Sequence, residues 1–492
     1  MKALLIYPEF PDTFWSFKHA LKFIQKKAAF PPLGLLTLGP MLPNDWTLRL
    51  IDMNVTTVAE RDLSWADIAF ISAMSVQRRS AREIIARCKE AGIRIVAGGP
   101  LFTSEHEEFE QVDHFVLNEA ELTLPPFLAD LAQQVPRRIY KSSEFCDIGK
   151  TPEPLWELID MKRYASMSIQ FSRGCPFNCE FCNVTALFGH KPRIKRADQV
   201  ISELNALYQL GWKGQIFFVD DNFIGNKGYL KKHLLPALIE WRKGKRGIHF
   251  NTEASVNLAD DEELMEMMVQ AGFDAVFVGI ETPDEGSLAE CNKKQNKNRD
   301  MVGTVKCIQR AGLQVQGGFI VGFDNDTQSI FQRQIDFIQK SGIVTAMVGM
   351  LQAPAGTRLY ERLKREGRLL GYMSGDNNDG TTNFITRMDM ETLREGYRKI
   401  MLHIYSRKHY YQRVKTFLRE YKAPKVDIPL DWQSILAFFR SNIFLGIIGS
   451  ERFQYWGLLW WTLFKRPRHL PLAITLAVYG YHFRKVSLSH IL

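Results

Sequence analysis

The first 140 residues alternate short apolar runs with longer stretches whose apolar residues recur at helical spacing. Between residues 78 and 92 those positions are i, i+3, i+4 and i+7, occupied by Ala81, Ile84, Ile85 and Cys88. That period predicts an amphipathic helix, which Gly92 would end. The apolar runs predict strands at Ala3–Tyr7, Thr47–Ile51, Ile68–Ile71, Ile93–Ala97 and His114–Leu117. Strands alternating with helices predict an α/β domain with a doubly wound parallel sheet over residues 1–145.

Three loops follow these predicted strands at the edge where an open α/β sheet binds its ligand. They are "SAMSVQ" (Ser72–Gln77), "GGP" (Gly98–Pro100) and "NEAE" (Asn118–Glu121). Paired glycines would let a large flat molecule approach the backbone. No G-x-G-x-x-G follows the first strand, which argues against a dinucleotide. The loops therefore either bind another ligand or are ordinary turns.

The strand and helix rhythm resumes after a predicted linker at residues 146–165. Strands are predicted at Ser168–Phe171, Gln215–Val219, Ile248–Thr252, Ala275–Ile280, Val315–Val321 and Val344–Met350. Helices are predicted between them, for instance at Asp198–Leu210, Asp260–Gln270 and Asp326–Lys340. Six successive units predict a partial (β/α)6 barrel over residues 166–369, with its active site at the carboxyl ends of the strands.

Residues 370–492 lose this alternation and are predicted to form a helical, basic and aromatic-rich domain. The tail Phe453–Phe483 holds two apolar runs, each shorter than the roughly 20 residues that span a bilayer. Trp and Tyr beside Lys and Arg suit a helix lying at a membrane interface. A buried aromatic helical subdomain has the same composition, so both interpretations stay open.

The chain has a formal net charge of +9 and contains seven cysteines. The start, "MKALLIYPEFP", has an apolar run too short for a signal-peptide core, so we expect a cytoplasmic protein with reduced thiols. The positive charge is compatible with nucleic acid, an anionic membrane or an acidic ligand. Because the charges are spread over most of the chain, a solvated surface is the simpler interpretation.

Three of the cysteines lie within eight residues, in "CPFNCEFC", at the spacing Cys175-x3-Cys179-x2-Cys182. A structural zinc site needs four protein ligands, and no second CxxC is present. An iron–sulfur cluster also takes four cysteines as a rule, so three would leave one iron open to an outside ligand.

This triplet, with Phe181 just before its last cysteine and a predicted first barrel strand ahead of it, resembles the signature of the radical S-adenosylmethionine (SAM) superfamily. The resemblance implies a 4Fe–4S cluster on Cys175, Cys179 and Cys182, with SAM on the fourth iron. SAM cleavage would then supply a 5′-deoxyadenosyl radical that removes hydrogen from an unactivated carbon. The resemblance also implies SAM contacts at the ends of barrel strands. The candidates are Phe181, Asp220, Glu253, Glu281 and Gly322, although each carboxylate could instead cap a helix.

A doubly wound domain ahead of such a barrel resembles the cobalamin-binding class of the superfamily. "FPPLGLLTLGPMLP", "AGGPLF", "VLNEAELTLP" and "LQAPAGTRLYERLKREGR" resemble one branch of that class, which includes hopanoid C-2 methylases. The D-x-H-x-x-G motif that supplies a histidine to cobalt in many cobalamin proteins is absent. The prediction of cobalamin therefore depends on the resemblance to this family and not on a histidine ligand in the sequence. The candidate contacts are Met74, Ser75, Gln77, Gly98, Gly99, Asn118 and Glu119.

The resemblance implies an enzyme that methylates an unactivated carbon of a small molecule or lipid, such as a hopanoid. Its expected partners are a one-electron donor such as flavodoxin or ferredoxin and, where the tail faces a membrane, a membrane surface; no nucleic acid is expected. Three alternatives stay open. They are a non-methylating cyclisation or rearrangement, methylthiolation of RNA, and a non-catalytic sensor. No side-chain nucleophile or general base is identified.

Overall fold

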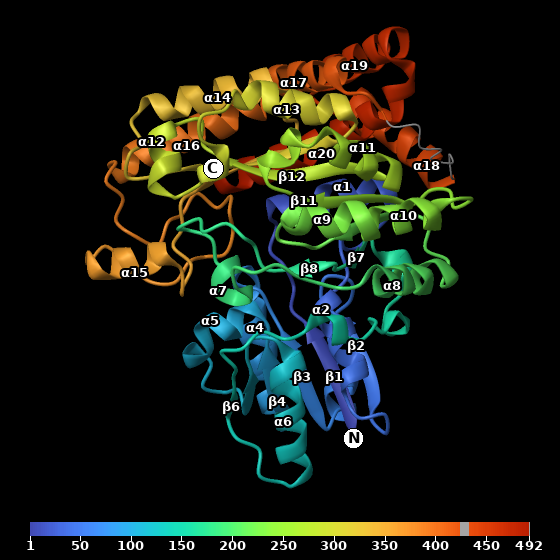
Figure 1. The fold of residues 1–492 in the computed structure, drawn as a ribbon, viewed down its shortest axis with the longest axis vertical. Coiled ribbons are helices and arrows are strands. Elements are labelled where there is room, and N and C mark those ends of the chain that lie inside the picture. Colours follow the sequence, from blue (N-terminus) through green and yellow to red (C-terminus); the bar gives the residue numbers. More distant parts are fainter. Residues whose placement is uncertain (424–431, 492) are drawn as a thin grey trace.

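The computed structural model describes residues 1–423 and 432–491 (Figure 1). It contains two parallel six-stranded sheets, followed by a helical C-terminal region. The N-terminal sheet lies at one end of the molecule, and most helices of the C-terminal region gather at the other (Figure 1). Residues 424–431 and 492 of the predicted helical domain lie outside the described part of the chain.

The N-terminal sheet has the strand order β2-β1-β3-β4-β5-β6, and all its pairs are parallel. The strands are β1 (Lys2–Tyr7), β2 (Thr47–Asp52), β3 (Ile68–Ser72), β4 (Arg94–Gly98), β5 (His114–Val116) and β6 (Ile139–Tyr140). The first five confirm the predicted strands. β6 was not predicted, because two residues are too few to show a period.

Helices cover both faces of this sheet. They are α2 (Leu33–Leu38), α3 (Glu60–Trp65), α4 (Arg78–Glu90), α5 (Pro100–Glu105) and α6 (Ala120–Ala132). Leu4 and Ile6 of β1 share one apolar cluster with α3, α4 and α5, whereas Ala3 and Leu5 share the other with α2 and α6. Alternate side chains of a strand point to opposite faces, so a sheet covered on both sides needs a continuous apolar run.

The second sheet has the order β14-β13-β12-β11-β10-β7, so its strands follow one another in sequence as a partial barrel requires. They are β7 (Met167–Ile169), β10 (Gln215–Phe218), β11 (His249–Glu253), β12 (Phe273–Glu281), β13 (Gln314–Val321) and β14 (Ala346–Met350). A short antiparallel pair, β8 (Ser172–Arg173) and β9 (Arg193–Ile194), lies beside the sheet.

Local sequence signals set the limits of the barrel helices. The helices are α7 (Val184–Phe188), α8 (Ala197–Gln209), α9 (Lys227–Tyr229), α10 (Leu235–Arg242), α11 (Glu262–Ala271), α12 (Glu285–Glu290), α13 (Met301–Ala311) and α14 (Ser329–Ser341). In α11 the Asp261 side chain accepts a hydrogen bond from the Leu264 amide at 3.1 Å. Gly272, with φ of 103°, ends the same helix in the left-handed conformation that glycine adopts without strain.

The C-terminal region is helical, as predicted. It comprises α15 (Arg358–Arg365), α16 (Met390–Ile404), α17 (Arg407–Glu420), α18 (Trp432–Ser441), the π-helical turn η12 (Asn442–Ile448), α19 (Arg452–Lys465) and α20 (Leu470–Ile491). Tyr410, Phe417, Leu476 and Phe483 of this region are buried in the same apolar core as the barrel. Within the described residues, no helix combines the length and the apolarity needed to cross a bilayer.

The helix α1 (Lys18–Ile24) leaves the N-terminal sheet and packs against α18 and α20. Figure 1 shows it at the level of the barrel, away from the other early segments. Phe14, Ala20 and Phe23 belong to the barrel's apolar core. The domain limits at residues 145, 165 and 369 stay a prediction, and residues 14–28 contribute to the second core although they precede the first limit.

Candidate active site

The cysteine triplet lies in the loop that follows β7 and β8, at the carboxyl edge of the barrel. The Cys175 amide donates to the Gly189 carbonyl at 3.3 Å, and the Cys182 amide to the Cys179 carbonyl at 3.3 Å. The amide of Glu180 donates to the carbonyl of Cys291 at 2.9 Å, which ties the loop to the segment after β12. Backbone hydrogen bonds thus hold the loop at both ends.

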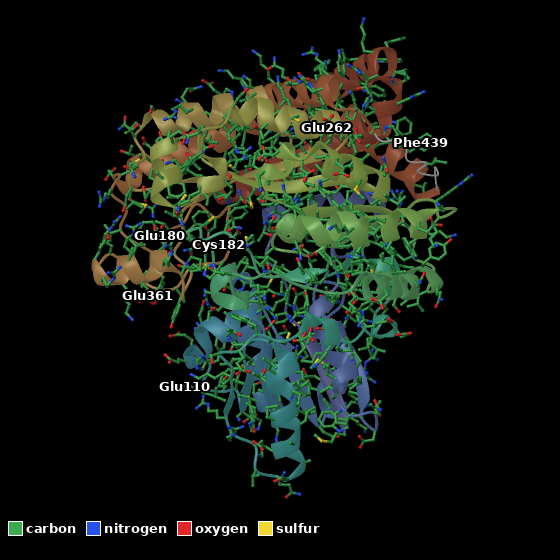
Figure 2. The ribbon with its side chains drawn as sticks, viewed as in Figure 1. Glu110, Glu180, Cys182, Glu262, Glu361 and Phe439 are labelled. Atoms are coloured by element: carbon green, nitrogen blue, oxygen red, sulfur yellow. The ribbon has the colours of Figure 1, made fainter. Side chains whose placement is uncertain are left out.

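The helix α15 supports the same loop from the C-terminal side. Arg362 forms an ion pair with Glu180 at 2.8 Å, and the Leu359 amide donates to the Glu180 carbonyl at 3.0 Å. Arg358 donates to the carbonyl of Asn178 at 2.8 Å. Figure 2 shows Glu180 and Cys182 near α15, the helix that carries Glu361. The C-terminal region therefore positions the cysteine loop.

The three thiols share one environment. Burial raises the pKa of Cys182 to about 12, and that of Cys175 also rises through burial, with the neighbouring Cys179 thiol adding to both shifts. Among the described residues, no three His, Cys, Asp or Glu side chains converge as the ligands of a single metal ion do. The donor set, three half-buried or buried thiols on one loop, fits an iron–sulfur cluster in which each thiolate binds its own iron.

A buried ion pair lies beside the cysteine loop. Glu281, at the end of β12, accepts from Lys293 Nζ at 2.6 Å, and both side chains are about one-tenth exposed. Burial acts to lower the pKa of Lys293, but Glu281 and the thiols of Cys179 and Cys182 act in the opposite direction, so the net shift is upward. Glu281 has a φ of 65°, which a non-glycine residue adopts only when its surroundings hold it there.

Sequence reasoning singled out Glu281 and missed Lys293. The lysine stands in "CNKKQNK", twelve positions further along, and nothing local separates it from its neighbours. Lys293 meets Glu281 only because the tertiary fold brings the two residues together. The same holds for Cys291, which is buried and whose pKa is raised to about 12 by burial, with the Glu281 charge adding to the shift.

Two adjacent aspartates follow β10, and they have different surroundings. Asp220 is 1% exposed and accepts hydrogen bonds from the Phe171 amide at 3.1 Å and from the amide and hydroxyl of Ser172. Asp221 lines a large cavity and accepts from the Gly174 amide at 3.2 Å. Asp220 is therefore already engaged with the backbone below the cysteine loop, while Asp221 faces the open space.

Phe181 belongs to the cysteine loop, and its ring contacts the segment after β13 that holds Gly322. The Phe181 ring is 6.3 Å from that of Phe323, edge to face. Gly322 has a φ of 103°, and its amide donates to Asp326 at 2.8 Å. Neither residue lines the large cavity, and their part in SAM binding stays a prediction.

A cavity of about 790 Å³ separates the N-terminal sheet from the barrel and takes residues from all three regions of the chain. Five of the predicted cobalamin contacts and one predicted SAM contact line it: Met74, Gly98, Gly99, Asn118, Glu119 and Glu253. Ser75 and Gln77 do not line it. Gln77 lies beneath the loop, where its side chain accepts from the Met74 amide and donates to the Pro8 carbonyl.

The two adjacent glycines fit a close approach of a ligand to the backbone. A Cβ on Gly98 would stand 2.7 Å from the Val116 carbonyl oxygen, and one on Gly99, whose φ is 87°, would stand 2.7 Å from Ser72 Oγ. A side chain at either position would displace the strand ends that shape the cavity wall. Met74, 46% exposed, borders the same cavity.

Glu119 joins the two sheets. It forms ion pairs with Arg173 and Arg193, each at 2.9 Å, and accepts from the Cys146 amide at 2.8 Å. Glu121 pairs with Arg173 at 2.8 Å. The predicted ligand loop of the first domain is thus fastened to the strands that flank the cysteine triplet.

Several lining segments were not predicted, because they come from far along the chain. The segment Thr13–Lys18 lines the cavity before α1, and Gly375–Asn378 lines it from the C-terminal region together with Tyr479 of α20. No local period marks these residues as ligand-facing.

Comparison with known families agrees with this arrangement. Residues 26–128 match the B12 binding domain, residues 169–338 match the Radical SAM superfamily, and residues 357–491 match a domain of unknown function, DUF4070. The first two matches fall on the two sheets that border the cavity.

Whole-chain relatives are methyltransferases. The chain is 40% identical to an uncharacterized methyltransferase of Synechocystis sp. over 98% of its own length and 91% of the relative's. It is 34% identical to the hopanoid C-2 methylase of Rhodopseudomonas palustris over 79% of its length and 74% of that protein's. The solved structure of the cobalamin-dependent SAM radical enzyme OxsB shares its fold, with a TM-score of 0.62 at 16% identity over 99% of this chain and 80% of that one.

Fold, domain order and cysteine loop together define a radical SAM enzyme with a cobalamin-binding domain. Within that class, this chain belongs to the cobalamin-dependent radical SAM methyltransferases. The sequence-based expectation of methylation is favoured over non-methylating rearrangement. Its cofactors are a 4Fe–4S cluster, SAM and cobalamin.

Proposed function

We propose that this enzyme methylates an unactivated carbon of an apolar, lipid-class substrate such as a hopanoid, and that it works at a membrane surface. Electrons would come from a small one-electron donor such as flavodoxin or ferredoxin. The observation that carries the proposal is the cavity of about 790 Å³, because it is lined by loops of the first domain and by strand ends of the barrel, and its wall is more apolar than polar.

The aromatic wall suits a rigid apolar substrate. Trp15 packs edge to face on Phe277 at 5.4 Å between ring centroids, and Phe30 lies 5.3 Å from Phe217. All four residues line the cavity. Aromatic side chains bury large apolar area, and a cavity whose wall is more apolar than polar is typical of a site for apolar molecules. The 34% identity to a hopanoid C-2 methylase supports the same substrate class.

The residues that would hold the cluster and SAM lie outside the cavity lining, in the cysteine loop and at and after the end of β12. The thiols of Cys175, Cys179 and Cys182 would hold the cluster, and Glu281 with Lys293 would face the amino and carboxylate groups of SAM. The glycines at residues 98 and 99 would admit cobalamin. When bound, these cofactors supply the radical and the methyl group. The chain itself orients the substrate carbon and keeps water away through its aromatic wall.

The direct test is an anaerobic assay of the protein with reconstituted cluster, cobalamin, SAM, a strong reductant and a hopanoid. We expect 5′-deoxyadenosine and S-adenosylhomocysteine to form together, with a substrate product heavier by one methylene. Cys179→Ala should abolish deoxyadenosine formation. Deoxyadenosine without homocysteine would count against methylation, and methylation of soluble substrates only would count against the lipid class.

The placement of cobalamin is tested by a pair of glycine variants. Gly99→Ala should retain at least about tenfold less cobalamin after gel filtration, measured by visible absorbance, because its Cβ would push into the Ser72 hydroxyl at the cavity wall. Gly92→Ala is the matched control, since Gly92 also has positive φ, 70°, but no atom lies within 4 Å of an added Cβ. Equal retention by both variants would contradict the placement.

A further inference from the structure

We propose that ten exposed apolar side chains of α18, η12 and α19 form a docking surface for an anionic lipid bilayer, and that α1 connects this surface to the substrate cavity. The inference rests on the proposed lipid substrate. The docking surface consists of Phe438, Phe439, Ile443, Phe444, Ile447, Ile448, Phe453, Trp460, Leu463 and Phe464. Figure 2 shows Phe439 at the outer edge of the molecule.

Each of these side chains is 36% to 76% exposed, and all fall within 27 consecutive residues. The opposite face of the same helices is fully packed, with Leu445, Tyr455 and Leu458 at 0% exposure. A surface helix normally pairs one apolar face with a polar one. Here both faces are apolar, and a contiguous exposed apolar patch marks a site of protein or membrane contact.

Charge identifies the occupant as an anionic bilayer. Arg452, Lys465, Arg466 and Arg468 are exposed beside the apolar residues. The acidic residue of this stretch, Glu451, is 3% exposed and paired with Arg484 at 2.8 Å. Apolar side chains with Lys and Arg at both ends of α19 match the acyl and headgroup layers of an anionic membrane. A second copy of the chain would instead bring like charges together.

The helix α1 touches both the docking surface and the cavity. The ring of Phe23 lies 5.8 Å from that of Phe444, and Arg440 of α18 donates to the Phe23 carbonyl at 3.0 Å. At the other end of α1, Phe17 and Lys18 line the cavity, and the Phe17 ring lies 5.0 Å from Tyr479. An apolar molecule leaving the bilayer at this surface would therefore meet the cavity within the length of one short helix.

The burial of α20 limits how the docking surface can be tested. The helix α20 fills the core with Leu476, Ala477 and Phe483, each 0% exposed. Removal of the C-terminal helices would unfold the protein, so substitutions of exposed residues are needed. We choose the triple variant Ile448→Ser, Phe453→Ser and Phe464→Ser, whose side chains are 69%, 75% and 76% exposed.

The matched control replaces three exposed apolar residues outside the docking surface, in the triple variant Val135→Ser, Leu370→Ser and Ile385→Ser. Their side chains are 64%, 64% and 52% exposed. Full-length proteins are floated with vesicles of phosphatidylcholine alone or with phosphatidylglycerol. We expect the wild type and the control to float with the anionic vesicles, and the docking-surface variant to float at least about tenfold less. Circular dichroism verifies that all three are folded.

Three results would overturn the docking surface. They are no flotation of the wild type, equal flotation of all three proteins, and a salt-stable dimer in light scattering that only the docking-surface variant loses. Assay of 5′-deoxyadenosine and S-adenosylhomocysteine on the same preparations separates this inference from the proposed function. Both products without flotation would reject docking and leave the methylase intact. Flotation without products would support docking and count against the proposed activity.

Discussion

Three carboxyl groups lie at the carboxyl ends of β10 and β11, where Asp220 is buried and Asp221 and Glu253 are partly exposed on the cavity wall. Burial raises the pKa of Asp220 to about 7, of Asp221 to about 6 and of Glu253 to about 8, and in Glu253 the charges of the two aspartates add to the effect. The sequence predicted carboxylates at these strand ends. It did not distinguish Asp220, which binds backbone amides, from Asp221, which faces the cavity, because adjacent residues of one loop have the same local signal.

The pH dependence of stability follows from Glu253. Its folded-state pKa of about 8 exceeds the ordinary 4.5, so its contribution to folding is complete below pH 4.5 and is lost as pH rises through 8. Glu253→Gln keeps the neutral form at all pH values. We expect the variant to match the wild type near pH 5 and to exceed it by roughly 3 kcal/mol in free energy of unfolding near pH 9.

Urea denaturation of the cofactor-free proteins between pH 5 and pH 9 measures this difference. If the free energies of unfolding of Glu253→Gln and the wild type changed in the same way with pH, Glu253 would not be protonated in the folded protein.

At the scale of elements, the C-terminal tail divides into two helices with opposite roles. In the sequence, Phe453–Phe483 is one aromatic stretch. Its composition was compatible both with a helix facing a membrane and with a buried helical subdomain. The structure places the outer face of α19 at the surface and packs α20 inside, where Phe483 stacks on Phe14 at 4.1 Å between centroids. Periodicity within α20 could not reveal this, because the helix is apolar nearly all round and its partner lies over 460 residues away.

A pair of phenylalanine variants tests this division. Phe483 is 0% exposed, so Phe483→Ala should lower the free energy of unfolding by about 3–5 kcal/mol through lost apolar contact and a residual cavity. Phe464 is 76% exposed, so Phe464→Ala should change the free energy of unfolding by less than about 0.5 kcal/mol. Thermal or urea unfolding gives both values. Similar losses of unfolding free energy in the two variants would contradict the assignment of Phe483 to the core and of Phe464 to the surface.

At the scale of the whole molecule, ion pairs fasten the N-terminal sheet to the barrel across the cavity. Glu119, 4% exposed, is shared between two arginines of the short antiparallel pair β8 and β9 beside the barrel. Figure 1 shows β8 between the two sheets. A rigid joint here keeps the loops of the first domain opposite the cysteine loop of the second, which the transfer of a group between two cofactor domains requires.

Glu119→Gln should destabilise this joint. The substitution leaves Arg193, whose side chain is 16% exposed, without its carboxylate, and removal of one partner of a buried ion pair costs about 3–5 kcal/mol. The exposed Glu110, labelled in Figure 2, provides the matched control, and Glu110→Gln should be neutral within about 0.5 kcal/mol. Differential scanning calorimetry measures both. An unchanged unfolding temperature for Glu119→Gln would show that the pairs do not hold the two sheets together.

The amino-acid sequence by itself determined the two parallel sheets, the order of the regions and the cysteine triplet, because hydrophobic period and ligand spacing are properties of neighbouring residues. Only the tertiary structure decided that Lys293 meets Glu281, that α1 joins the barrel, and that Asp221 rather than Asp220 faces the cavity. These relations depend on which distant segments pack together, and packing is chosen by the whole apolar surface that must be buried at once.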